Sequence, residues 1–290
     1  MKSISIVNHN VLDPKNNLYT HLTTAPPKWW SSLVHDPNLY IEIRKNNIVE
    51  VYYQGGTLAK LVYDKDTNQI IPIAHPKYIG HTDVNDIRYY KDNETHTPIY
   101  GDCSEWLERK IENMKKNIRC WYTEKHKSIE SVSEKKIQGE LVVKNREKYL
   151  DSEFSHRLYE GERKEVRIDL VKIEDNQIVF EELKKINDSR LHTTKESGPE
   201  ILKQMSDYEA FISKNQKPLL EYYSKLIKIK ESLGLPLPKK KDSLVLNTKP
   251  VLIIANNYMK MTSERAKRIE SIKQTLEKAS IKYRIFDYNG

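Results

Sequence analysis

The stretch that decides the fold is VRIDLVKI at residues 166–173, followed by QIVFEELKKI at residues 177–186. Apolar and polar side chains alternate along these segments, which is typical of β-strands with one face in a core. The residues between them, Glu-Asp-Asn at 174–176, are polar and contain no glycine. The pattern predicts a β-hairpin.

Two acidic residues and a lysine lie on this predicted hairpin. Because strand side chains alternate between two faces, Glu182 and Lys184 point the same way and Leu183 points into the opposite layer. Asp169 lies within cross-strand reach on the partner strand in a plausible register. The hairpin is therefore expected to gather carboxylates, an ammonium group and a backbone carbonyl.

Helices are expected on both sides of the hairpin. Residues 150–159 place apolar side chains at helical spacing, so Glu153 is expected to lean over the sheet from a helix. Beyond the hairpin, Gln204 and Tyr208 lie four residues apart on a second predicted helix and share one of its faces.

Converging carboxylates beside a carbonyl form an oxygen-only site that suits Mg²⁺ or Mn²⁺ rather than zinc. Such an ion polarises a phosphoryl oxygen and activates water for attack. Lys184 beside the ion would hold that water or offset developing negative charge. The constellation therefore indicates cleavage of a phosphodiester.

At these residues the chain resembles the PD-(D/E)XK nuclease superfamily, over roughly residues 145–257. The added Gln-x-x-x-Tyr is similar to its RecB-like and lambda-exonuclease-like branches. The resemblance implies a restriction-endonuclease-like mixed sheet flanked by helices, in the α+β or α/β class. It implies metal ligation by Glu153, Asp169, Glu182 and the Leu183 carbonyl, catalysis by Lys184 with these acids, and accessory roles for Gln204 and Tyr208. One departure is that Ile168, rather than proline, precedes the aspartate.

A Glu-x-Lys motif alone carries little information in a chain with 31% charged residues. Three further copies begin at Glu108, Glu134 and Glu162, in polar segments expected to be helix or loop. Only the copy at Glu182 follows an Asp-bearing strand and precedes a helix with Gln and Tyr. The alternative is a surface hairpin with ordinary salt bridges.

Residues 1–100 are expected to form a small β-rich domain of unknown role, and residues 101–290 the nuclease-like domain, with its core at about 145–290. Four short strands separated by turn-rich segments predict an antiparallel meander, at 40–44, 48–53, 57–63 and 69–74. Gly55-Gly56 is expected to form a hairpin turn rather than a phosphate-binding loop. Later helices are expected at 102–127, 217–233 and 262–279, and strands at 251–255 and 281–287.

The net charge of +8 arises entirely after residue 100, where 39 Lys/Arg face 31 Asp/Glu. A basic surface attracts a polyanion by counterion release, although lysine-rich surfaces also keep proteins soluble. Arg190 has a planar fork suited to phosphate. His156 and His192 are secondary candidates for proton relay, against ordinary structural hydrogen bonds.

No leading apolar run resembles a signal peptide, and no stretch approaches the ~20 apolar residues of a membrane span, so a cytoplasmic protein is expected. The favoured hypothesis is a metal-dependent nuclease acting on DNA, with RNA not excluded, in antiphage defence or DNA repair. The alternative is a catalytically silent nuclease-fold subunit that binds DNA or a partner protein. The N-terminal region is a candidate contact for a partner or a second copy.

Overall fold

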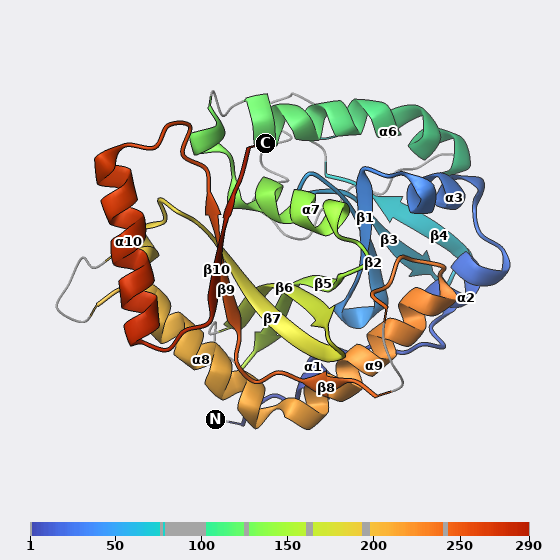
Figure 1. The fold of residues 1–290 in the computed structure, drawn as a ribbon. Coiled ribbons are helices and arrows are strands. Elements are labelled where there is room, and N and C mark those ends of the chain that lie inside the picture. Colours follow the sequence, from blue (N-terminus) through green and yellow to red (C-terminus); the bar gives the residue numbers. More distant parts are fainter. Residues whose placement is uncertain are drawn as a thin grey trace.

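The computed structural model describes residues 2–75, 78, 103–124, 128–160, 165–192, 198–239 and 243–289. Within these ranges the protein is a mixed α+β fold with two sheets (Figure 1). The first is an antiparallel sheet in the order β1-β2-β3-β4, and the second is a mixed sheet in the order β10-β9-β7-β6-β5 with β8 pairing to β7. The strands are β1 (Leu39–Arg44), β2 (Ile48–Tyr53), β3 (Gly56–Asp64), β4 (Gln69–Ile73), β5 (Tyr149–Arg157), β6 (Glu165–Glu174), β7 (Gln177–Lys185), β8 (Val245–Leu246), β9 (Val251–Asn256) and β10 (Tyr283–Asp287).

The predicted hairpin is confirmed as β6 and β7, which pair antiparallel up to Glu174 opposite Gln177. Asp175 and Asn176 form its turn with φ angles of 47° and 67°. Asp and Asn tolerate this left-handed region better than other non-glycine residues, and a two-residue hairpin turn requires it. The turn therefore closes without glycine.

The helix predicted over residues 150–159 is wrong, because this segment forms strand β5 antiparallel to β6. Leu150 and Phe154 are buried in the main core. A spacing of four residues fits one face of a helix, but it also fits one face of a strand, where the period is two. Pairing with β6 satisfies the backbone hydrogen bonds of the segment and selects the strand.

Helices cover both faces of the mixed sheet. Buried side chains of α8 and α9 pack against one face within the larger core, and α7 packs against the other in a smaller core. The expected strand-helix-strand at the C-terminal end is confirmed as β9, α10 and β10, with the two strands parallel. The helices are α1 (Ile6–His9), α2 (Asn17–Thr24), α3 (Lys28–His35), α6 (Cys103–Arg119), α7 (Glu134–Lys144), α8 (Glu200–Lys214), α9 (Gln216–Ser232) and α10 (Ser263–Lys278), with short 3₁₀ or π turns η1 (Lys45–Asn47), η2 (Cys120–Glu124), η3 (Ile129–Ser131) and η4 (Ser189–Leu191).

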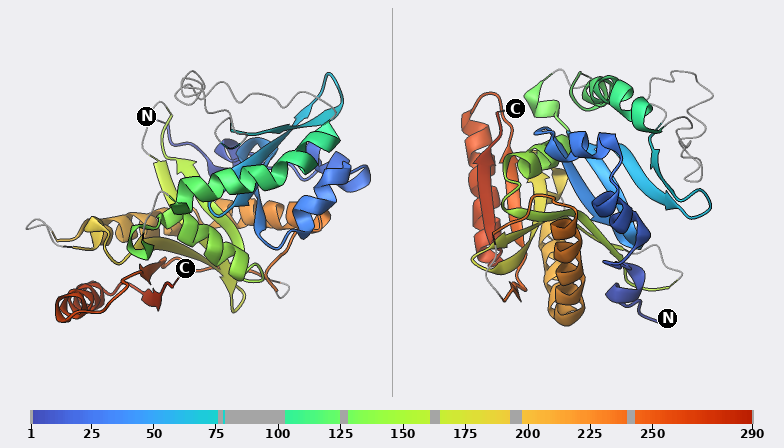
Figure 2. Two further views of the ribbon diagram at one scale, coloured as in Figure 1. Left: turned by 90° about the horizontal axis from the view of Figure 1, so that it is seen from above. Right: turned by 90° about the vertical axis from the view of Figure 1, so that its right-hand side faces the viewer.

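The four-stranded meander is confirmed as β1 to β4, and it lies at the opposite end of the molecule from α10 (Figure 2). Its apolar side chains belong to the same large core as those of β5, β6 and α9. The expected boundary at residue 100 lies outside the described residues. None of the helices in the described ranges is both long and apolar enough to cross a bilayer.

A group of four charged residues, three of them buried, joins the meander to the mixed sheet. The Lys230 ammonium lies 2.8 Å from the Glu42 carboxylate, and Arg44 lies 3.1 Å from Asp151. These residues come from α9, β1 and β5. Burial and the neighbouring Glu42 raise the pKa of Asp151 from 3.8 to about 7, although Arg44 and Lys230 oppose this shift.

The buried Asp151 should make the protein less stable as the pH rises from 3.8 to about 7. In this window the unfolded chain has released the proton of this carboxyl, whereas the folded state retains it, so the free energy of unfolding falls with pH. Asp151→Asn removes the titrating group and should flatten this part of the curve in urea unfolding across the window. The exposed Asp66→Asn serves as control, and an unchanged slope in Asp151→Asn would contradict the assignment.

The β2–β3 turn touches the backbone of α7. A Cβ atom on Gly55 would lie 2.2 Å from the carbonyl oxygen of Lys135, and one on Gly139 would lie 2.6 Å from the Gly55 nitrogen. This approach requires glycine at both positions, because a side chain at either one would push the β2–β3 turn and α7 apart. The β2–β3 hairpin turn therefore fixes the position of the N-terminal end of α7.

Gly55→Ala should destabilise the protein by about 2 kcal/mol more than Gly234→Ala, because forcing extra carbon into a packed contact costs energy of this order. Both glycines have positive φ, at 81° and 66°, so both substitutions carry a similar backbone penalty. A Cβ on Gly234 meets no atom within 4 Å, so this variant isolates that penalty. Chemical denaturation measures the difference in the free energy of unfolding between the two variants. Equal values would show that the β2–β3 turn can move to accommodate the added Cβ atom.

Candidate active site

The candidate site begins where β6 and β7 stop pairing. The last backbone pair toward it is Leu170 opposite Glu181. Beyond this pair, the Leu183 N–H donates to the Asp169 carboxylate at 2.9 Å, and the Asp169 carbonyl accepts from the Gln138 side chain at 2.6 Å. Side chains thus replace the backbone ladder and turn Asp169 and Leu183 toward a common point.

The Lys184 ammonium lies at this point, although the side chain is almost completely buried. It donates to the Glu182 carboxylate and, at 2.7 Å, to the Leu183 carbonyl. It also lies 3.8 Å from an oxygen of Asp169 and 3.8 Å from an oxygen of Glu134. One cation is therefore surrounded by oxygens from β6, β7 and α7.

One of the two carboxylate oxygens of Glu182 has no hydrogen-bond partner. The residue is 3% exposed, and its Oε2 atom is buried without a hydrogen-bond partner. Burial, reinforced by the neighbouring Asp169, raises the pKa of Glu182 to about 8 despite the opposing charge of Lys184. An unpaired buried carboxylate oxygen is costly, which marks this atom as a potential ligand.

The acid that a helix contributes to the site is Glu134. It begins one of the three Glu-x-Lys copies that were not expected from the sequence to take part in the site. It is the first residue of α7, where the Ser133 side chain caps the helix by accepting from the Lys136 N–H at 3.2 Å. Burial raises the pKa of Glu134, and Lys184 partly opposes the shift. The capping serine before an acidic first turn was the signal that could have identified it.

Glu153 is not brought to this group. It lies on β5 rather than on a helix, with a φ of 52°, and its carboxylate pairs with Lys135 at 3.1 Å. It lines a separate cavity of about 200 Å³ beside Arg44 and Lys60. The structure therefore places Glu134, not Glu153, beside Lys184.

Gln204 and Tyr208 share a face of α8, as predicted. The Gln204 amide donates to Glu182 at 2.7 Å and to the Tyr208 hydroxyl at 2.7 Å. The Tyr208 hydroxyl donates to the Arg167 carbonyl. The pair therefore ties α8 to both strands of the hairpin and fixes one oxygen of Glu182.

Arg190 follows β7 in the short turn η4. Its guanidinium forms two bonds to the Asp188 carboxylate, at 2.9 and 2.7 Å, and this partner raises the Arg190 pKa. Phosphate binding by Arg190 stays a prediction.

The two candidate histidines lie outside the group around Lys184. His156 is buried on β5, where Nε2 lies 3.1 Å from the Ile4 carbonyl and the ring packs edge-on against His9. His192 lies beside Arg268, with 2.9 Å between the ring Nε2 and the Arg268 Nε. Both contacts are ordinary structural interactions.

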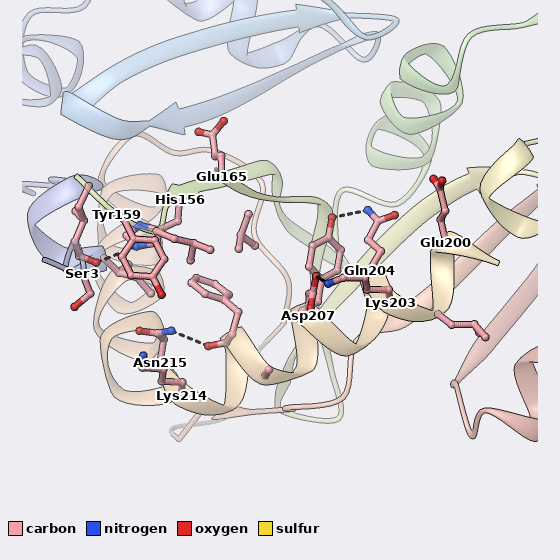
Figure 3. Close-up of a pocket in the computed structure, with 18 of the residues that line it drawn as sticks. Ser3, His156, Tyr159, Glu165, Glu200, Lys203, Gln204, Asp207, Lys214 and Asn215 are labelled. Carbon is pink, nitrogen blue, oxygen red and sulfur yellow. Dashed lines mark hydrogen bonds and ion pairs between the residues drawn. The ribbon is translucent and has the colours of Figure 1, made fainter. Parts of the chain in front are cut away.

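A groove of about 920 Å³ runs along α8 (Figure 3). Gln204, Tyr208 and Arg190 line it on the side of the candidate site, and His156 and Tyr159 line it farther along. Its charged lining residues balance in sign: Arg190, Lys203 and Lys214 against Glu165, Glu200 and Asp207. The groove therefore adjoins the site but carries no net attraction for a polyanion.

The donor set at the site consists of carboxylate and carbonyl oxygens, which suits Mg²⁺ or Mn²⁺. In the described part of the chain, no three Asp, Glu, His or Cys side chains converge closely enough to hold an ion as they stand. The Lys184 ammonium takes the central place instead. The free Glu182 oxygen and the Leu183 carbonyl are the oxygens that would be available to a divalent cation in its place.

Comparison with protein-family models, with curated proteins and with solved structures finds no match for this chain. Its function must therefore be inferred from the site.

Proposed function

We propose that the protein is a metal-dependent nuclease that hydrolyses phosphodiester bonds in DNA, with a restriction-endonuclease-like arrangement of the mixed sheet. The observation that carries the proposal is the convergence of Asp169, Glu182, Glu134 and the Leu183 carbonyl on the Lys184 ammonium. Desolvation makes it costly to bury a lysine among three acids and a carbonyl. Clusters of this kind are frequent at catalytic sites.

Each residue has a role in this proposal. Asp169, Glu182 and the Leu183 carbonyl would hold Mg²⁺ or Mn²⁺, which supplies polarisation of the phosphoryl oxygen and activation of water. Lys184 would leave Glu182 and donate to the attacking water or to the phosphoryl oxygen that gains charge. Gln204 keeps Glu182 oriented during this exchange.

Glu134 completes the site from α7. Its carboxylate lies 3.8 Å from the Lys184 ammonium and retains contact with solvent. A carboxylate in this position would orient Lys184 and the water beside it. Antiphage defence and DNA repair are the settings that the resemblance to PD-(D/E)XK nucleases implies for such an enzyme.

Cleavage of plasmid and linear DNA tests the proposal directly. The purified protein should cut in Mg²⁺ or Mn²⁺, and EDTA should abolish cutting. Parallel RNA substrates determine the nucleic acid. Absence of product from every substrate with either metal would overturn the proposal.

A second candidate is a catalytically silent subunit with the same fold. It is favoured by the direct hydrogen bond from Lys184 to Glu182, which gives both groups a partner without a metal. This candidate predicts salt-sensitive DNA binding or partner binding with no product under any metal.

A further inference from the structure

Two exposed methionines lie on the short loop between β9 and α10. Met259 is 70% exposed and Met261 is 49% exposed. Exposed apolar side chains that occur singly need no explanation, but a pair on one short loop forms a small apolar projection. The loop lies beyond the C-terminal end of β9 (Figure 1).

The backbone beneath the two methionines is held firmly. The Asn257 side chain donates to the carbonyls of Ile129 and Glu130 at 3.2 and 3.0 Å. The Met259 N–H donates to the Glu130 carboxylate at 3.0 Å. The loop is therefore fixed to the segment that precedes α7.

Arg265 strengthens this base from the first turn of α10. Its guanidinium contacts both Glu130 oxygens, at 2.8 and 3.0 Å, and also donates to the Lys260 carbonyl at 2.8 Å. It lies 4.4 Å from the centre of the Tyr258 ring. The loop thus presents flexible thioether tips on a constrained backbone.

The projection follows the strand that pairs with the one carrying Lys184: β9 runs parallel to β7 with Ile254 opposite Lys184, and the loop begins after Asn256. Glu130, its main anchor, precedes Glu134 by four residues. Arg268 on α10 contacts His192, which follows Arg190 by two residues. Because β7 and β9 are parallel, the loop and Lys184 lie toward the same edge of the mixed sheet.

The charge around the projection suits a polyanion. Within residues 257–268, Lys260, Lys267 and Arg268 are exposed against one exposed acid, Glu264, and the exposed Asp287 accepts from the Asn256 side chain at the base of the loop. The positive excess contrasts with the balanced groove along α8. Lysine and arginine side chains bind the phosphates of a nucleic acid backbone.

We propose that this loop binds duplex DNA by inserting Met259 and Met261 between base pairs, while Lys260, Lys267 and Arg268 contact the flanking phosphates. The proposal rests on the proposed function, because it assigns double-stranded DNA as the substrate class of that site. Apolar wedges that unstack base steps are a known means of bending a duplex, and flanking cations offset the energetic cost.

A duplex fits this surface better than a single strand. Proteins that bind single strands stack the bases on open aromatic rings. The one aromatic ring of the loop, Tyr258, is covered by the Arg265 guanidinium. The narrow, flexible thioether side chains of methionine are suited to insertion between stacked base pairs. They are less suited to forming a flat surface on which a single base stacks.

The test uses the full-length protein in EDTA, where cleavage cannot interfere, and a short duplex that contains 2-aminopurine. Stacking quenches this base, so insertion should raise its fluorescence when the parent protein binds. The double variant Met259→Ser/Met261→Ser should abolish the rise and weaken affinity about tenfold, the loss expected for one or two unstacking contacts. The matched control is Val245→Ser, which removes another exposed apolar side chain.

The flanking cations are tested by the salt dependence of binding. Lys260→Ala combined with Lys267→Ala should reduce the slope of log affinity against log salt by about 2, since each phosphate contact contributes about 0.9. Circular dichroism and the melting temperature verify that each variant is folded.

A rise in fluorescence that survives loss of both methionines would overturn the inference, as would a parent protein that binds anionic phospholipid vesicles but not the duplex. Failure of the proposed function is separable. Cleavage in Mg²⁺ without a fluorescence change would contradict only the proposed insertion of the methionines. A methionine-dependent fluorescence change without cleavage would contradict only the proposed nuclease activity.

Discussion

Asp169→Asn should reduce DNA cleavage about a thousandfold, the size of effect seen when one preorganised electrostatic group is removed from an active site. The asparagine amide oxygen can still accept the Leu183 N–H that the carboxylate accepts at 2.9 Å, so the split between β6 and β7 should persist. The lost negative charge is the quantity being tested. Initial rates in Mg²⁺ at matched protein concentration measure the loss.

The matched control is Glu174→Gln, which removes an exposed carboxylate at the turn end of the same strand. It should cleave at the parental rate. Lys184→Met provides a companion measurement. Because burial already raises the pKa of Glu182, that carboxyl can take up a proton when its partner is lost, and the fold should persist. Unimpaired cleavage by Asp169→Asn or by Lys184→Met would contradict the assignment of the site.

Glu134→Gln should lower cleavage about a hundredfold, whereas Glu153→Gln should change it by less than about twofold. Glu134 lies 3.8 Å from the Lys184 ammonium, and Glu153 pairs instead with the exposed Lys135. Exposed ion pairs contribute little to stability, so the Glu153 variant should also keep its melting temperature.

This pair of variants decides which acid serves the site, because the two substitutions are chemically identical and the residues lie on neighbouring elements. The rate of cleavage and the midpoint of urea unfolding are measured for both. If Glu153→Gln loses activity while Glu134→Gln retains it, α7 plays no part in the chemistry.

The hairpin could be predicted from the sequence because its two signals are local. Alternation fixes which side chains of β6 and β7 share a face, and Asp175 and Asn176 can adopt the left-handed conformations of the turn. Once the strands pair, Asp169 and Glu182 follow as neighbours without further information.

The origin of the helical acid could not be predicted in the same way. The apolar spacing of Leu150 and Phe154 suits both a helix and a strand, and only pairing with β6 decides between them. Glu134 lies 35 residues before Asp169 in sequence, and its proximity to Lys184 depends on how α7 packs. Local pattern carries no information on such a contact.

The electrostatic interactions within the site also could not be predicted from the sequence. Residue types indicated a metal site, but not that Lys184 would hold the central position or that one oxygen of Glu182 would be buried without a partner. Likewise, the sequence suggested that Gln204 could touch phosphate or water, and its amide instead contacts Glu182.

The contact between Gly55 and Gly139 has an evolutionary consequence. The two positions lie on different elements, 84 residues apart, yet neither can acquire a side chain while the other backbone stays in place. Relatives of this chain should therefore change both positions together, usually with an altered length of the β2–β3 turn. Coordinated variation at these positions would show how the packing of the meander against α7 has changed as lineages diverged.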